Sequence, residues 1–181
     1  MEGYFDDPER TGVDRIADPP APGEKEGKVW MYSGDEAEMD SDGYISITGR
    51  IKDLIIRGGE NIHPLGVENC LFQHPLIQEV SVVGVPDEKL GEAVAAFIVP
   101  CRGVCTEDGV GGKDLLGTTS GAKDILTRKS VREWVAGNLS SHLAPKYVFW
   151  TDEYPKTASG KIQKFKLRDM AKDMLAAGSS S

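Results

Sequence analysis

Three glycine-containing segments carry the charged side chains with which this chain could bind a ligand. Ser33-Gly34-Asp35 offers a carboxylate, which could accept hydrogen bonds from the two hydroxyls of a ribose. Residues 49–61 combine three arginine or lysine side chains with a glycine pair, and residues 157–161 form a polar loop that ends in a lysine. Because glycine lets a ligand approach the backbone closely, these patterns place charge where a ligand can reach it.

Each segment also has a purely structural interpretation. Asp35 follows a glycine and could bond to its own backbone in a turn. Arg50 and Lys52 could be solvated charges at the end of a strand, and Lys161 could be an exposed lysine in a polar loop. Gly58-Gly59 could form only a tight turn. The segments are therefore informative in combination rather than singly.

The composition and charge of the chain narrow the classes of protein to which it could belong. It has 181 residues, of which 39% are hydrophobic, enough for one domain and an ordered extension. The formal net charge of -8 argues against a general nucleic-acid surface, which needs clustered Lys and Arg. Residues 151–181 carry six Lys or Arg against four acids, which leaves a charge of -10 for residues 1–150. We therefore expect an anionic ligand to meet the C-terminal segment.

The cysteines and the hydropathy of the chain bear on its environment. Cys70, Cys101 and Cys105 lack the paired spacing of a zinc site or of a disulfide framework, so we expect reduced thiols and no bound metal. No stretch approaches the roughly 18 apolar residues of a membrane span, and the N-terminal residues lack the pattern of a signal peptide. We expect a chain that works inside the cell, in the cytoplasm or an organelle.

In the N-terminal half, irregular segments alternate with short apolar runs. Residues 1–28 are rich in Pro, Gly and charge, which predicts irregular surface structure. Residues 29–32 and 44–48 are apolar or alternating and predict a hairpin-like unit across an acidic turn. A proline in the first turn favours a helix over residues 64–73, which ends before Pro75.

In the C-terminal half, strands and helices are interspersed. Residues 79–85 and 93–99 are rich in Val and Ala and predict a half-buried hairpin with its turn at residues 86–89. Residues 101–124 contain six glycines and little periodicity, which predicts a variable surface loop. The remaining elements are a helix from about Thr127 with Val131, Val135 and Leu139 on its apolar face, a strand over residues 147–150, and a terminal helix marked by Leu167, Met170, Met174 and Leu175. The pattern predicts an α+β fold, a small mixed or antiparallel sheet flanked by helices and preceded by a β-hairpin.

In their order and spacing, the motifs resemble those of the adenylate-forming superfamily of acyl-CoA synthetases, luciferases and peptide-synthetase adenylation domains. Residues 3–11 are similar to the family's segment just after its substrate-pocket region, and Ser33-Gly34-Asp35 resembles its Thr-Gly-Asp motif with Ser replacing Thr. Residues 43–53 resemble the stretch that crosses into the family's small C-terminal domain. Pro155-Lys156-Thr157-Ala158-Ser159-Gly160-Lys161 matches its closing lysine motif, and residues 57–64 are most similar to the branch of fatty, medium-chain or aryl acyl-CoA synthetases.

The resemblance implies a role for each motif. Asp35, assisted by Arg50, would hold the 2′ and 3′ hydroxyls of the ATP ribose. Lys161 would be catalytic, approaching the substrate carboxylate and the α-phosphate, and Lys52 would be the hinge about which the small domain turns. The channel for the pantetheine thiol would be lined by Gly58, Gly59, Glu60 and Asn61. The implied cofactors are ATP with Mg²⁺, bound mainly by the family's large N-terminal domain, and CoA.

The same resemblance predicts how the chain divides and what it does. Residues 1–51 would be the incomplete C-terminal end of the large adenylation domain, and residues 52–178 would be the small mobile domain. The parent enzyme would convert a carboxylic acid, expected to be a fatty acid, with ATP and CoA into acyl-CoA, AMP and pyrophosphate through an acyl-adenylate. The large domain would be the partner of this chain. We expect the isolated chain to be inactive in adenylation, because the acid pocket and the phosphate loop belong to that domain.

Two other functions are compatible with the sequence. The chain could be a stand-alone, non-catalytic module that binds CoA or a partner protein. It could also come from a peptide-synthetase adenylation domain, whose acceptor is a carrier protein. Residues 117–123 resemble a phosphate-binding loop in composition, but they lie within the glycine-rich insert without an apolar strand before them, so we assign them to the loop.

Overall fold

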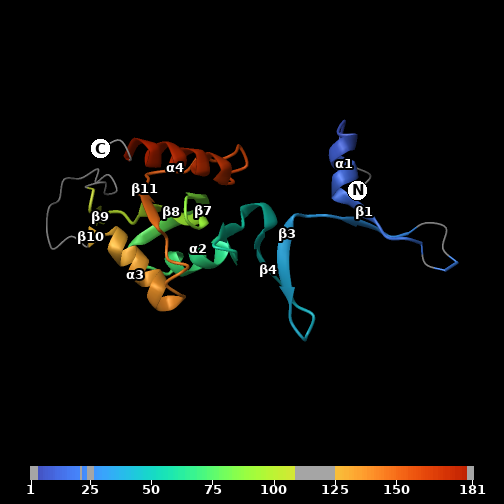
Figure 1. Ribbon diagram of the computed structural model, residues 1–181, viewed down its shortest axis with the longest axis horizontal. Coiled ribbons are helices and arrows are strands. Elements are labelled where there is room, and N and C mark those ends of the chain that lie inside the picture. The colour runs from blue at the N-terminus through green and yellow to red at the C-terminus, as the bar shows by residue number, and fades with distance from the viewer. Residues whose placement is uncertain (1–3, 21, 24–26, 109–124, 179–181) are drawn as a thin grey trace.

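The computed structural model describes residues 4–20, 22–23, 27–108 and 125–178 (Figure 1). A mixed sheet with helices on both faces forms the larger part, and a smaller group of strands and one helix precedes it in the chain. Within the described residues, no helix has the length and apolar character to cross a membrane. The predicted α+β class is confirmed.

Strand β8 (Gly91–Pro100) is the centre of the five-stranded sheet. It pairs antiparallel with β7 (Ile77–Asp87) along nearly its whole length and parallel with β11 (Tyr147–Trp150). The hairpin of β5 (Ile55–Arg57) and β6 (Glu60–Ile62) joins the end of β8. The predicted strands are thus confirmed, although β7 continues through Pro86 and Asp87, which the sequence placed in the turn.

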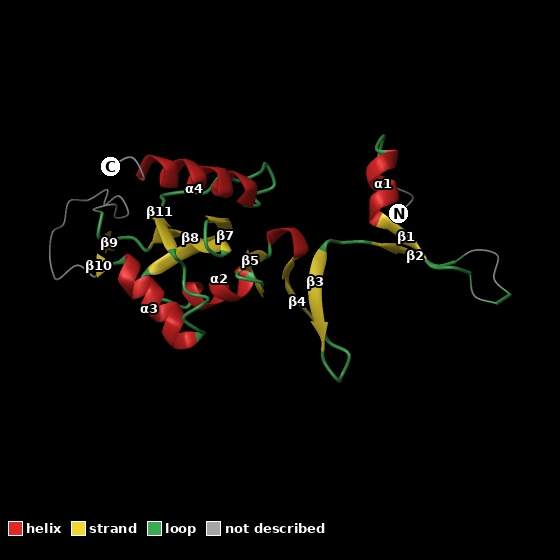
Figure 2. Cartoon of the chain, viewed as in Figure 1, coloured by secondary structure: helices red, strands yellow, loops and turns green. Residues whose placement is uncertain are grey.

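Helices cover both faces of this sheet (Figure 2). Helices α2 (Pro64–Phe72) and α3 (Arg128–Asn138) pack on one face, and α4 (Lys164–Gly178) packs on the other. Because successive strand residues point to opposite faces, Val82 and Val94 belong to the first core while Val83 and Ala93 belong to the second. Burial on both faces explains why β7 and β8 read as continuous apolar runs rather than alternating ones.

Local sequence signals set the ends of these helices. Pro64 occupies the first turn of α2, where its missing N–H costs no hydrogen bond. At α3 the Thr127 side chain accepts from the Ser130 N–H, and the Ser130 hydroxyl is bonded back to the Thr127 backbone, which forms a capping box. Both helix starts were therefore predictable from sequence.

The N-terminal strands pair differently from the prediction. Strand β2 (Val29–Met31) pairs with β1 (Arg15–Ala17), and β4 (Ile45–Arg50) pairs with β3 (Asp35–Met39). The predicted hairpin of residues 29–32 with 44–48 is wrong, because the side chain of Asp40 accepts N–H bonds from Asp42 and Tyr44 and closes a tight turn. That turn brings β4 back onto the segment directly before it.

Residues 1–28 also contain more regular structure than the sequence indicated. Helix α1 (Pro8–Asp14) begins at Asp7, whose carboxylate accepts the Arg10 N–H at 2.9 Å, and proline takes its first position. A helix of seven residues with a good cap and no apolar periodicity is hard to distinguish from a loop by pattern alone. Strand β1 follows it directly.

Two predictions, the surface loop at residues 101–124 and the apolar faces of the last two helices, need correction. In the glycine-rich segment, β9 (Cys105–Thr106) pairs parallel with β10 (Ile125–Leu126) and Val104 is buried, so its start belongs to the core rather than to a surface loop. Residues 117–123 lie outside the described residues. The predicted apolar side chains Leu139, Met170 and Met174 are exposed by 39% or more, because the buried faces of α3 and α4 are made by Val131, Val135, Leu167 and Ala171.

Candidate functional site

A cavity of about 710 Å³ lies where the N-terminal strands meet the start of α4. Its lining includes Ser33 and Gly34 before β3, Arg50 at the end of β4, Lys52, and Lys161 before α4. Three of the predicted site residues, Arg50, Lys52 and Lys161, therefore share one cavity although 111 positions separate the first from the last. Asp35 lines a smaller cavity of about 340 Å³ that also includes Arg50.

Asp35 and Arg50 are cross-strand partners at the end of the β3–β4 hairpin. Their backbones are paired in register, and Arg50 Nε lies 3.0 Å from Asp35 Oδ1. The Ile51 N–H donates to the Gly34 carbonyl at 3.0 Å, which fixes the hairpin end. Both side chains keep exposed surface, 31% for Asp35 and 66% for Arg50, so the carboxylate can still accept donors from a ligand.

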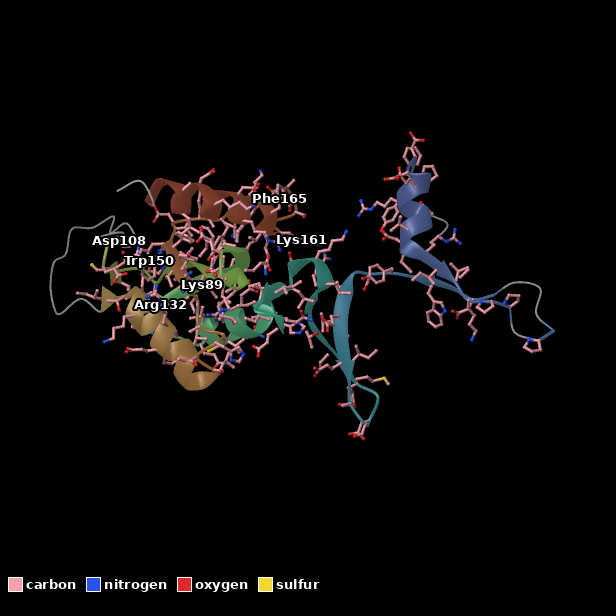
Figure 3. All side chains as sticks on the ribbon, in the orientation of Figure 1. Lys89, Asp108, Arg132, Trp150, Lys161 and Phe165 are labelled. Atoms are coloured by element: carbon pink, nitrogen blue, oxygen red, sulfur yellow. The ribbon has the colours of Figure 1, made fainter. Side chains whose placement is uncertain are left out.

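Lys161 ends a compact loop. Its carbonyl accepts the Thr157 N–H at 2.8 Å, and its own N–H donates to Thr157 Oγ1 at 3.1 Å. Gly160 has a φ of +83°, a conformation that non-glycine residues rarely adopt, so glycine is needed at this turn. Figure 3 shows Lys161 and Phe165 at the end of α4 nearest the β3–β4 hairpin, while Asp108 and Trp150 lie at the other end of the domain.

The cations around Lys161 differ in their ion pairs. Lys164 Nζ lies 2.9 Å from Glu68 Oε1 of α2, and Arg168 Nη2 lies 2.6 Å from Asp53 Oδ1. Within the described part of the chain, Lys161 has no acidic partner within 4.0 Å. Its exposed ammonium is therefore available to an anionic ligand, as is that of Lys52, which lines the same cavity.

Lys52 lies in the short connection between the N-terminal strands and the sheet. It is the middle residue of the 3-10 turn η1 (Ile51–Asp53), and its side chain is exposed. Beyond it, Leu54 N–H donates to Ile51 O at 3.4 Å, and β5 begins at Ile55. A single exposed turn between two separately paired groups of strands is the kind of position that can absorb a change in φ and ψ.

The predicted CoA-channel residues lie outside this cavity. Gly58 and Gly59 form the positive-φ turn between β5 and β6, and Gly58 N–H donates to Leu90 O at 2.8 Å. Glu60 Oε2 lies 3.4 Å from His142 Nε2, and His142 Nδ1 lies 2.8 Å from Ser140 Oγ. The structure thus adds the loop around His142 to this region, which lies outside every motif of the sequence.

The β7–β8 turn beside this glycine pair is held by an ion pair. Lys146 Nζ contacts Asp87 Oδ2, and Asp87 Oδ1 accepts the N–H groups of Lys89 and Leu90, both at 3.0 Å. The hydrogen bond from Lys146 and those from the two backbone N–H groups lower the pKa of Asp87 to about 2. Sequence analysis missed both residues because 59 positions separate them and neither belongs to a motif.

Asp87→Asn should destabilise the chain near neutral pH, because it removes the carboxylate that pairs with Lys146 and accepts two backbone N–H groups in the folded state. The folded pKa is lower than that of the unfolded carboxyl, so this stability is present above about pH 4 and is lost as pH falls towards 2. The urea midpoint should therefore be lower in the variant at pH 7, and the difference should shrink between about pH 4 and 2. A difference that does not depend on pH would contradict this account.

No group of three or more His, Cys, Asp or Glu side chains could hold a metal ion among the residues whose positions are described. The three cysteines are free; Cys70 is buried and Cys101 and Cys105 are partly so. Burial raises the pKa of the Cys70 thiol. The cavity around Lys161 is lined by more cationic than acidic side chains, and Asp35 beside it is paired with Arg50, an arrangement that suits an anionic ligand carrying hydroxyl groups.

Comparisons with known proteins agree with this geometry. Residues 66–161 match the model of the AMP-binding enzyme C-terminal domain. The chain is 40% identical over 180 residues to a putative acyl-CoA synthetase of Bacillus subtilis, YngI, covering 99% of this chain and 27% of that protein. It is 36% identical to the mitochondrial medium-chain acyl-CoA ligase ACSF2 of Rattus norvegicus, covering 97% of this chain and 24% of that protein.

A solved structure gives the same result for the fold. The chain superimposes on ATP-bound MatB from Rhodopseudomonas palustris with a TM-score of 0.68 and 29% identity, over 96% of this chain and 28% of that one. The chain thus spans about a quarter of the length of the relatives it matches. It belongs to the family of AMP-binding enzyme C-terminal domains, within the adenylate-forming enzymes.

Proposed function

We propose that this chain acts as the C-terminal part of an ATP-dependent acyl-CoA synthetase and supplies the catalytic lysine and the hinge. The reaction would convert a carboxylic acid, ATP and CoA into acyl-CoA, AMP and pyrophosphate through an acyl-adenylate. The observation that carries the proposal is the position of Lys161. It has no acidic partner in the described part of the chain, and it lines one cavity with Ser33, Gly34 and Arg50.

Lys161, Asp35 and Arg50 have separate roles in the proposed adenylation step. Lys161 places positive charge where the acid oxygen attacks the α-phosphate, and this stabilises the charge that develops there. Asp35 accepts the ribose hydroxyls, and Arg50, 3.0 Å from its carboxylate, holds that carboxylate in place. ATP supplies the AMP group that activates the acid, and most of its contacts and its Mg²⁺ would belong to a large N-terminal domain.

Thioester formation would use a different face of the small domain. We assign residues 52–178 to that domain and residues 1–51 to the end of the large one. Rotation at Lys52 would withdraw Lys161 and bring Gly58, Gly59, Glu60 and Asn61 to the acyl-adenylate, where they line the path of the CoA thiol. This assignment is supported by exposed apolar side chains on the N-terminal strands, such as Trp30 and Ile45, which are 56% and 67% exposed.

The proposal is tested by product analysis of the native protein. It is incubated with ATP and Mg²⁺, CoA and a panel of aliphatic and aromatic carboxylic acids, and AMP and acyl-CoA are separated by chromatography. We expect acid-dependent formation of both, best with a medium-chain fatty acid, as the name of the rat relative suggests. Binding of CoA without any AMP would instead indicate a non-catalytic module. AMP formation without CoA consumption would favour a carrier-protein acceptor.

Asp35→Ala should weaken nucleotide binding by roughly 10- to 100-fold, because it removes a charged acceptor from two ribose hydroxyls. The measurement is calorimetric titration of the native protein with AMP or ATP. Glu38→Ala on the same strand is the matched control, since Glu38 is exposed and lines neither cavity. Equal affinity of the Asp35 variant and the control would remove Asp35 from the binding site.

A further inference from the structure

Arg168 joins the proposed hinge to the helix that follows the catalytic loop. It lies one turn into α4, and its Nη2 donates to Asp53 Oδ1 at 2.6 Å and to the Lys52 carbonyl oxygen at 3.4 Å. The guanidinium and the carboxylate are each about three-quarters buried, so the contact is shielded from solvent. No sequence pattern indicates this contact, because 115 positions separate Arg168 from Asp53.

The two acceptors fix the peptide that directly follows the pivot. The Lys52 carbonyl oxygen belongs to the planar peptide shared with Asp53. When φ or ψ of Lys52 changes, this oxygen therefore moves together with Asp53. A side chain that holds both groups thus lets the φ and ψ of Lys52 change while it prevents rotation further along the chain. The rigid body therefore begins at the carbonyl of Lys52.

The contacts of the same helix also fix the position of the loop that contains Lys161. Lys164, one turn before Arg168, is paired with Glu68, whose Oε1 also accepts the Val82 N–H at 2.7 Å. The catalytic loop is closed onto the start of α4 by the Gln163 N–H, which donates to Pro155 O at 2.8 Å. Hinge peptide, helix and catalytic loop thus form one connected unit.

We propose that Arg168 is a positioning residue that confines the pivot to Lys52 and transmits the orientation of this hinge to Lys161. The inference rests on the proposed function. Without the guanidinium, the turn η1 is free to move as a whole, so the pivot spreads over several residues and Lys161 no longer returns to one place. Misplacement of about 1 Å in such a site reduces the rate by roughly 100-fold.

The first test uses hydrogen exchange of the 181-residue chain and needs no activity. In Arg168→Gln, the amides of Asp53 and Leu54 should exchange at least about 10-fold faster, while those of β8 stay unchanged. Lys172→Gln is the matched control, because Lys172 lies one turn further on α4 and, among the residues that the structure describes, its ion pair is with Asp169, at 3.9 Å. Unchanged exchange at Asp53 and Leu54 would overturn the inference.

The second test measures both half-reactions in the native protein. In Arg168→Gln, kcat for adenylate formation should fall about 10- to 100-fold while KM for ATP stays within about twofold. The exchanged pair Asp53→Arg with Arg168→Asp should recover part of this loss. An equal fall of both half-reactions together with a lower urea midpoint would show a purely structural role and overturn the inference. A wild-type protein that makes no adenylate would refute the proposed function instead, and hydrogen exchange would still decide whether Arg168 holds the hinge.

Discussion

Lys161→Ala should slow adenylate formation by at least about 100-fold and leave thioester formation from a supplied acyl-adenylate largely intact. The ammonium group has no acidic partner in the described residues, so its charge is available to stabilise the phosphate during attack. In the proposed mechanism, the rotated domain would present the face of Gly58 and Gly59 during thioester formation, and Lys161 would be withdrawn. We therefore expect the Lys161 variant to lose much more rate in adenylate formation than in thioester formation.

The measurement follows each half-reaction in a single turnover of the native protein. Adenylate is quantified after rapid quench, and acyl-CoA is followed after addition of a synthetic acyl-adenylate and CoA. Lys166→Ala is a matched control, because Lys166 is an exposed cation on α4 that does not line the cavity. Equal losses in both half-reactions would refute the role of Lys161 in adenylation.

Lys52→Pro should have the opposite effect, a thioester rate reduced by about 100-fold with adenylation nearly unchanged. Proline fixes φ near -65°, a value that the first turn of a helical segment tolerates, so the η1 turn can persist. Rotation about the N–Cα bond of residue 52 is then blocked. The protein would then fold and form the adenylate, but its small domain would fail to rotate into the orientation proposed for thioester formation.

The control for this variant is Lys52→Ala, which removes the ammonium and leaves both backbone bonds free. We expect its thioester rate to stay within a few-fold of the wild type. Circular dichroism and the urea midpoint verify that both variants fold. If alanine impaired the thioester rate as much as proline, the side chain rather than rotation would matter and Lys52 would not be the hinge.

Much of the sheet and its helices was predictable because the signals are local. Pro64 at the start of α2 and Thr127 at the cap of α3 act within one turn of chain, and the valine-rich runs of β7 and β8 follow from burial on both faces. The N-terminal pairing failed for the converse reason. Apolar runs show that strands form but not which strands pair, and the turn at Asp40 decides that.

The site residues also differ in whether local sequence signals point to them. Asp35, Arg50 and Lys161 belong to contiguous motifs, so the resemblance of these motifs was enough to propose them as site residues, and the structure places Arg50 and Lys161 at one cavity. Asp53 and Arg168 meet only through the fold. Each looks like an ordinary charge in its own segment, and only tertiary contact shows what the charge holds.

The most direct test of the account is affinity labelling of the native protein with an ATP acyl phosphate, which transfers its acyl group to lysines beside the nucleotide phosphates. The modified residues are then identified by peptide mass spectrometry, with and without excess ATP. The account predicts that Lys161 is labelled and that ATP protects it, whereas the exposed Lys89 on the β7–β8 turn reacts weakly and without protection. Labelling of Lys89 and Lys161 to the same extent, unaffected by ATP, would contradict the claim that Lys161 meets the nucleotide.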